Sequence, residues 1–267
     1  MKHYHCVQGK DEWLRLRMGK PTASEFDRLI TPAKKETKTG EILGWQPTKG
    51  ETRRNYAIYL ITELILDMPL SGANTASMQH GTAWEQNARA AYEASMGVDV
   101  VECGFCTNDE GTYGASPDAF VGEDGSLELK SPAKPEIHVA RMVNPDVLVE
   151  EYFVQTQGQL FVTEKKWTDL VSHFGGLPMV RVRVVPDPEF QTRLGVAVRQ
   201  FCAEVSDLVE RCLDKGWLKE SPALTGWIQE GDIDMVRKGS KKTAPQGDFD
   251  ISDEEIERIW AKTQVQE

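Results

Sequence analysis

A predicted β-hairpin constrains the fold of this chain more than any other segment. Residues 114–121 and 126–130 favour two strands, and the Gly-Glu-Asp-Gly stretch between them favours a turn. Because strand residues two apart share a face, Glu128 and Lys130 should point the same way, and the turn should bring Asp118 level with both. The hairpin therefore predicts two carboxylates and an ammonium group at one place.

Such a group of side chains suits the hydrolysis of a phosphodiester. Mg²⁺ prefers oxygen ligands, and one or two carboxylates with a substrate phosphate form its usual set. The metal lowers the pKa of a bound water, which supplies hydroxide near neutral pH. Lys130 could position that water or offset negative charge on the phosphate. An isolated motif of this kind is also compatible with a surface hairpin whose charges merely pair with one another.

The hairpin motif, Pro117-Asp118 followed by Glu128-x-Lys130, has companions elsewhere in the chain. The four blocks, in order, span residues 8–25, 81–89, 116–132 and 152–157. Together they resemble the lambda-exonuclease family of YqaJ-type viral recombinases, within the PD-(D/E)xK nuclease superfamily. The resemblance covers about residues 5–215.

The resemblance implies an α/β fold with a restriction-endonuclease-like PD-(D/E)xK core, in which helices flank a mixed central sheet. We expect the nuclease domain to span residues 1–220 and a C-terminal extension to span residues 221–267. Within the extension, residues 239–247 predict a flexible linker. A capping box at residues 252–255 predicts a short helix after it, with Ile256, Ile259 and Trp260 on one side.

The resemblance also assigns roles around the hairpin. Asp118 and Glu128 are expected to hold the metal, with the backbone carbonyl of Leu129 as a further oxygen ligand. Glu85 matches a glutamate that binds metal directly or through water, and Lys130 assists the attacking water. The alternative for Glu85 is a solvated charge on a helix.

Arg17, Ser24 and Ser116 match the residues that form a pocket for the 5′-phosphate of the degraded strand. The guanidinium offers a planar fork of donors for bidentate contact with a phosphate. Ser24 lies near a predicted helix N-terminus, which also favours an anion. The alternative for Arg17 is a surface ion pair with Glu12 or Asp11.

Gln155 matches a glutamine of the family's site, and Gln157 lies two residues further along the same predicted helix. Only one of the two can face the site directly. Lys34 and Lys35 lie in a predicted loop that could contact DNA.

The function implied by the resemblance is a Mg²⁺-dependent 5′→3′ exodeoxyribonuclease that degrades one strand of linear double-stranded DNA in phage-type recombination. Mn²⁺ is expected to replace Mg²⁺. The implied partners are DNA ends, two further copies in a ring-shaped homotrimer, and a single-strand annealing protein. Two alternatives stay open: a structure-specific or restriction-type endonuclease on the same core, and a non-catalytic module that binds DNA ends.

The net charge of −11 is distributed unevenly along the chain. Residues 1–60 have a balance of +5 and could follow phosphates, whereas residues 61–130 have a balance of −10 and contain the predicted metal ligands. No apolar run approaches the length of a membrane span, and the N-terminus lacks the apolar stretch of a signal peptide. We therefore expect a cytoplasmic protein of a bacterial or phage-infected cell.

Five cysteines, an odd number, favour a reducing compartment. Cys103 and Cys106 lie three residues apart in a predicted strand, so their side chains should face opposite sides. Only a turn at Gly104 would let both sulfurs reach one ion. We expect buried, inert thiols.

Periodicity places the remaining elements. Helices are predicted over residues 10–16, 22–29, 53–66, 82–96, 147–163 and 189–215. Strands are predicted over residues 98–107, 112–121, 126–130, 168–174 and 179–185, and a loop over residues 31–50.

Overall fold

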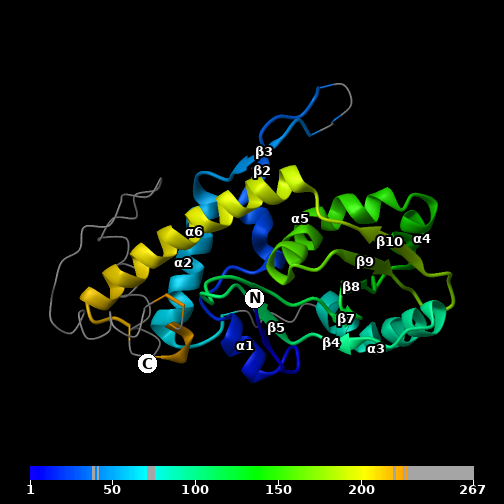
Figure 1. Ribbon diagram of the computed structural model, residues 1–267, viewed down its shortest axis with the longest axis horizontal. Helices are drawn as coiled ribbons and strands as arrows, with labels where there is room; N and C mark the ends of the chain where they lie inside the picture. Colours follow the sequence, from blue (N-terminus) through cyan, green and yellow to red (C-terminus); the bar gives the residue numbers. More distant parts are fainter. Residues whose placement is uncertain (38–39, 41, 71–75, 219–220, 225, 228–267) are drawn as a thin grey trace.

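The computed structural model of the protein describes residues 1–37, 40, 42–70, 76–218, 221–224 and 226–227 (Figure 1). A five-stranded mixed sheet has the order β10-β9-β8-β7-β4. Its strands are β4 (Val101–Glu102), β7 (Ala119–Val121), β8 (Gly125–Lys130), β9 (Trp167–Ser172) and β10 (Val180–Val184). Strands β8 and β9 are parallel and the other pairs are antiparallel. Helices connect the parallel pair, as a parallel connection requires.

Helices cover both faces of this sheet, because alternate strand residues bury apolar side chains on opposite sides (Figure 1). On one face, α3 (Ala76–Met96) packs Tyr92 against Leu127 and Leu129 of β8. On the other face, α4 (Pro135–Val143) and α5 (Asp146–Thr163) cover a cluster that includes Leu170 of β9. The predicted fold class, a mixed central sheet flanked by helices, is confirmed.

A second layer contains the N-terminal segments and two long helices. The two long helices are α2 (Glu51–Leu66) and α6 (Pro188–Asp214). Shorter helices are α1 (Asp11–Arg17) and the 3₁₀ helices η1 (Ala23–Arg28) and η2 (Pro222–Leu224). A three-stranded sheet of order β1-β5-β6 joins β1 (Lys2–Tyr4), β5 (Phe105–Thr107) and β6 (Gly114–Ala115). Its register pairs His3 with Cys106, and it thereby ties the N-terminus to the middle of the chain.

Two predicted strands are wrong in the same way. Residues 98–107 divide into β4 and β5, and residues 112–121 divide into β6 and β7, so each predicted strand contributes to two different sheets. A Cβ at Gly104 would lie 2.3 Å from the carbonyl oxygen of Tyr4, so the chain crosses β1 closely at this break. In the other break, Pro117 has no backbone N–H to continue a ladder.

Residues 31–50 are not a plain loop. They contain most of a hairpin of β2 (Ile30–Pro32) and β3 (Trp45–Pro47). Trp45 stacks on Phe153 and meets Phe190 edge-on, and this aromatic contact holds the hairpin against α5 and α6. Helix α4 was not predicted, since it is short and begins at a proline.

The predicted linker and final helix lie outside the described residues. Ala223, Leu224 and Trp227 are buried in the main core, so residues just beyond the predicted boundary at 220 pack on the body. The division into residues 1–220 and 221–267 stays a prediction. Among the helices of the described residues, none combines the length and apolar character needed to cross a membrane.

Candidate active site

Three carboxylates and a lysine form the centre of the candidate site, which we call the carboxylate cluster: Glu85, Asp118, Glu128 and Lys130. Residue Ala119 pairs with Leu127 across β7 and β8, so Asp118 lies opposite Glu128. The Nζ of Lys130 is 2.7 Å from Oε1 of Glu128. The structure therefore brings together the side chains that the hairpin predicted to meet.

Two amides from α5 fix the Glu128 carboxylate, which is only 3% exposed. Gln155 donates to Oε1 at 2.7 Å and Gln159 donates to Oε2 at 2.6 Å. Gln155 also accepts a hydrogen bond from Lys130 at 3.2 Å, and the Lys130 ammonium lies 4.2 Å from the centre of the Tyr152 ring. Helix α5 thus holds both charges of the Glu128–Lys130 pair in one geometry.

Gln159 was not among the residues predicted from the sequence. It lies four residues after Gln155, and side chains at this spacing share a helix face. That spacing is the signal that could have identified it. Gln157 faces away from the cluster: it donates to the carbonyl of Val185 and accepts from the backbone of Asp187, where it fixes the start of α6.

The electrostatics of the cluster are those of crowded like charges. Burial raises the pKa of Asp118 well above its usual range, and the negative charges of Glu128 and Glu85 raise it further. Burial alone would lower the pKa of Lys130, but the charges of Glu128 and Asp118 raise it overall. One ammonium group faces three carboxylates here, and because Arg89 pairs with both Glu85 and Glu102, the carboxylates still outnumber the cations.

Glu85, on α3, lies close enough to Glu128 and Asp118 for their negative charges to interact. It is half-buried, and burial is the main reason that its pKa is raised. Its Oε1 lies 2.8 Å from Arg89 one helical turn further on, and Arg89 also pairs with Glu102 of β4. The ion pairs direct Glu85 along the helix rather than into solvent.

The donor set fits a hard divalent cation. The backbone N–H of Leu129 donates to Oδ2 of Asp118 at 2.6 Å. Because the N–H and C=O of one strand residue point to the same side, the Leu129 carbonyl also faces the Asp118 side of β8. Carboxylate and carbonyl oxygens with excess negative charge are what Mg²⁺ or Mn²⁺ requires, and the residues that could hold it are Asp118, Glu128, Glu85 and Leu129.

A second constellation, the Arg17 group, lies next to the cluster and consists of Trp13, Arg17, Thr22, Ser24 and Ser116. Arg17 donates to the Thr22 hydroxyl at 3.2 Å, and that hydroxyl lies 3.2 Å from the hydroxyl of Ser24. The guanidinium also lies 4.2 Å from the centre of the Trp13 ring, whose N–H donates to Ser116 at 2.9 Å. The three residues predicted to meet a phosphate are therefore linked through Trp13 and Thr22, which were not predicted.

The Arg17 cation has no carboxylate partner among the ion pairs of the described residues, so the pairing with Glu12 or Asp11 is not found. Burial lowers its pKa. A partly desolvated guanidinium with aromatic and hydroxyl neighbours retains donors for an anion.

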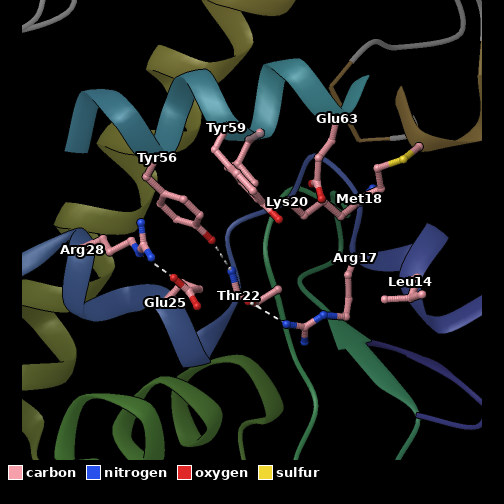
Figure 2. A pocket seen from close by; sticks show the side chains of 11 residues that line it. Leu14, Arg17, Met18, Lys20, Thr22, Glu25, Arg28, Tyr56, Tyr59 and Glu63 are labelled. Atoms are coloured by element: carbon pink, nitrogen blue, oxygen red, sulfur yellow. Dashed lines mark hydrogen bonds and ion pairs between the residues drawn. The ribbon is translucent and has the colours of Figure 1, made fainter. Parts of the chain in front are cut away.

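Arg17 also lines a cavity of about 200 Å³ between α1, η1 and α2 (Figure 2). Lys20 lies in the same cavity, only 7% exposed, and donates to the carbonyl of Ala223. Burial lowers the pKa of Lys20 to about 8, and the charge of Glu63 opposes that shift. Lys20 was not predicted, because nothing in the local sequence shows that it is buried.

Lys34 and Lys35 lie elsewhere. Both are exposed on the β2–β3 hairpin, where Lys35 bridges to Ile42, and they contact neither the carboxylate cluster nor the Arg17 group. The hairpin projects from the body next to α6 (Figure 1).

Comparison with known proteins places these features in a family. An alkaline exonuclease from Laribacter hongkongensis, solved alone and in complex with dAMP, is similar to this chain at a TM-score of 0.63 and 29% identity. Those matches cover 78% of this chain and 98% of theirs. A phage-related exonuclease from Haemophilus somnus shares the fold at a TM-score of 0.53 and 12% identity, over 72% of this chain and 96% of that one. No curated protein matches the sequence.

A family model described as the YqaJ-like viral recombinase domain matches residues 12–166, more than half of the chain. The match includes both the Arg17 group and the carboxylate cluster. This chain therefore belongs to the family of YqaJ-like viral recombinase domains.

Proposed function

We propose that this chain is a Mg²⁺-dependent 5′→3′ exodeoxyribonuclease that degrades one strand of linear double-stranded DNA during phage-type recombination. One observation carries the proposal: the carboxylate cluster and the Arg17 group meet in a single loop. Ser116 belongs to the Arg17 group and Asp118 to the carboxylate cluster, and only Pro117 separates the two residues. A terminal phosphate held by one group would place a nearby phosphodiester at the other.

Each residue has a role in this proposal. Asp118, Glu128, Glu85 and the Leu129 carbonyl would hold Mg²⁺, which Mn²⁺ could replace. When bound there, the cation supplies Lewis-acid chemistry at the scissile phosphate. Lys130 orients the attacking water and offsets charge on the phosphate, and Gln155 and Gln159 keep Glu128 and Lys130 aligned.

The Arg17 group recognises the DNA end. Arg17 contacts the 5′-phosphate in bidentate fashion, Ser24 and Ser116 donate hydroxyl hydrogen bonds, and Trp13 supports the guanidinium from one face. We further propose a cytoplasmic location, a homotrimer and cooperation with a single-strand annealing protein, all of which rest on the family resemblance. Light scattering of the purified protein tests the trimer directly.

The decisive experiment compares linear duplexes that carry a 5′-phosphate or a 5′-hydroxyl, each in Mg²⁺ and in chelator. We expect rapid digestion of the phosphorylated duplex, slow digestion of the hydroxyl form, and none in chelator. Arg17→Ala should remove the preference between the two ends. Arg15→Ala is the matched control, since Arg15 lies on the same helix with its side chain 62% exposed. Equal rates on both ends in the wild-type protein would contradict the end-recognition role.

Two rival functions have their own outcomes. A restriction-type or structure-specific endonuclease would cut a covalently closed circle as fast as a linear duplex. A non-catalytic end-binding module would bind linear duplexes and leave them intact in Mg²⁺ and Mn²⁺. The complete set of Asp118, Glu128 and Lys130 favours a hydrolytic enzyme over this module.

A further inference from the structure

The first strand of the chain contributes a histidine to a pair of buried cysteines. His3 of β1 and Cys106 of β5 are direct cross-strand partners, so their side chains share one face of the small sheet. The sulfur of Cys103 lies 3.6 Å from the sulfur of Cys106. The ligand atoms of His3, Cys103 and Cys106 all lie within 4.8 Å of one another.

The break between β4 and β5 makes this arrangement possible. Residues three apart in a continuous strand would face opposite sides, but the chain turns at Gly104 where it crosses β1. A Cβ at Gly104 would lie within 2.7 Å of backbone atoms of Tyr4 and Cys6, so only glycine allows this crossing. The expectation that the Cys103 and Cys106 side chains face opposite sides is therefore wrong, while their expected burial is confirmed.

The 3.6 Å between the Cys103 and Cys106 sulfurs is close to the separation of two thiolates that bind one zinc ion. Tetrahedral zinc holds its thiolates at about 2.3 Å, which separates two of them by about 3.8 Å. Cys103 and Cys106 are buried, and His3 has a buried Nε2 with no hydrogen-bond partner in the part of the chain that is described. A buried ring nitrogen without a partner is costly unless something binds it.

We propose that His3, Cys103 and Cys106 bind a thiophilic divalent cation of the Zn²⁺ type, at a site other than the carboxylate cluster, and supply three of its four tetrahedral ligands. Binding releases the two thiol protons to solvent, and the cation replaces them between the sulfurs and the imidazole nitrogen. The N/S donor set favours Zn²⁺ over Mg²⁺, whereas the oxygen donors of the carboxylate cluster suit Mg²⁺. This proposal does not depend on the nuclease function.

The site connects to the segment that carries Asp118. The backbone N–H of Cys103 donates to the carbonyl of Asp118 at 3.4 Å. The Gln8 side chain bridges the carbonyls of Cys103 and Pro117. A cation at His3, Cys103 and Cys106 would therefore stiffen the loop in which the carboxylate cluster and the Arg17 group meet.

The test uses the full chain without an affinity tag, produced with zinc in the medium and purified under reducing conditions. Elemental analysis should find stoichiometric zinc, and replacement by Co²⁺ should give the absorption bands of thiolate-to-cobalt charge transfer. Cys106→Ala and His3→Gln should each lose the zinc. Cys212→Ala and His5→Gln are the matched controls, because Cys212 is a buried cysteine of α6 and His5 lies beside His3, and neither belongs to the ligand group.

Two further measurements keep the outcome clear if a variant folds poorly. Asp118→Ala should retain its zinc, which separates this site from the carboxylate cluster. A zinc-selective chelator in excess Mg²⁺ should lower the melting temperature of the wild-type protein and leave that of Cys106→Ala unchanged. Wild-type protein without zinc or cobalt bands, zinc retained by folded Cys106→Ala, or a Cys103–Cys106 disulfide in the reduced preparation would each overturn the proposal.

Discussion

The carboxylate cluster and the Arg17 group lie on the two sides of Pro117, yet their charges are opposite in sign. The cluster gathers three carboxylates around one ammonium, and burial raises the pKa of Asp118. The Arg17 group holds a guanidinium among hydroxyls and an aromatic ring, with no carboxylate partner among the described ion pairs. One region is prepared for a cation and the other for an anion, as the binding of a metal and a phosphate side by side requires.

The largest expected effect comes from Lys130, which is the only cation in the carboxylate cluster. Lys130→Ala should lower digestion of linear duplex DNA by about 10³-fold or more, because charge stabilisation at the reacting phosphate is lost. End binding, measured by fluorescence anisotropy in Ca²⁺, should change little. Lys166→Ala is the control, since that lysine is mostly exposed and pairs with Asp124. Full activity of Lys130→Ala would remove the lysine from the mechanism.

The next effect concerns Lys20, which lies beside Arg17 in the cavity. The pKa of Lys20 is about 8 in the fold against an ordinary value of 10.5, so between these values the unfolded chain binds more protons. Stability should therefore rise with pH across that window, and below about pH 8 the buried charge is a full cost. Lys20→Met should be more stable than the wild type at pH 7, by up to about 3 kcal/mol.

Denaturant unfolding of both proteins at several pH values measures this difference. The difference should shrink toward pH 10.5, the ordinary value for lysine. Tyrosines and cysteines that titrate in the same pH range contribute equally to the stability of both proteins, so their contribution cancels in the difference. A difference that does not depend on pH would show that Lys20 remains charged in the fold.

Arg17→Lys tests whether the Arg17 group recognises a phosphate by charge alone or also by the shape of the guanidinium. Lysine keeps the charge but loses the planar fork and the stacking on Trp13. We expect the preference for 5′-phosphorylated ends to fall by about tenfold, which corresponds to about 1.4 kcal/mol. Arg15→Lys should leave the preference unchanged, and a full preference in Arg17→Lys would show that charge alone is sufficient.

The smallest expected effect is a gain in stability. Asp118→Asn removes one of the crowded carboxylates, while the amide oxygen can still accept the hydrogen bond from Leu129. Without divalent metal, this variant should be more stable than the wild type by about 1 kcal/mol, because it neither buries a charged carboxylate nor is repelled by Glu128 and Glu85. Added Mg²⁺ should stabilise the wild type and not the variant. Thermal melting in chelator and in Mg²⁺ measures both, and a less stable variant in chelator would contradict the repulsion.

Local patterns predicted much of the fold. Helices α2, α5 and α6 and strand β8 lie within a few residues of their predicted positions, and α6 is the most clearly amphipathic of the three helices. The β7–β8 register followed from the turn between the strands. The close crossing at Gly104 joins distant segments and was not predictable, whereas the break at Pro117, which has no N–H, could have been predicted from the sequence.

The same distinction applies to the candidate site. The positions of Asp118, Glu128 and Lys130 relative to one another depend on one hairpin, so the sequence predicted them. Trp13 reaches Ser116 across more than a hundred residues, and Lys20 reaches Ala223 across two hundred. Such partners depend on tertiary packing, which no local pattern encodes.

The pairing of β1 with β5 has a consequence for synthesis on the ribosome. Strand β1 can form only after its partner Thr107 in β5 has been synthesised. The two carboxylate oxygens of Glu128 can be bound only after Gln155 and Gln159 have been synthesised. Contacts this distant in sequence form late, after the intervening chain has emerged. In a nascent chain, the carboxylate cluster would thus be incomplete until residues through α5 have been translated.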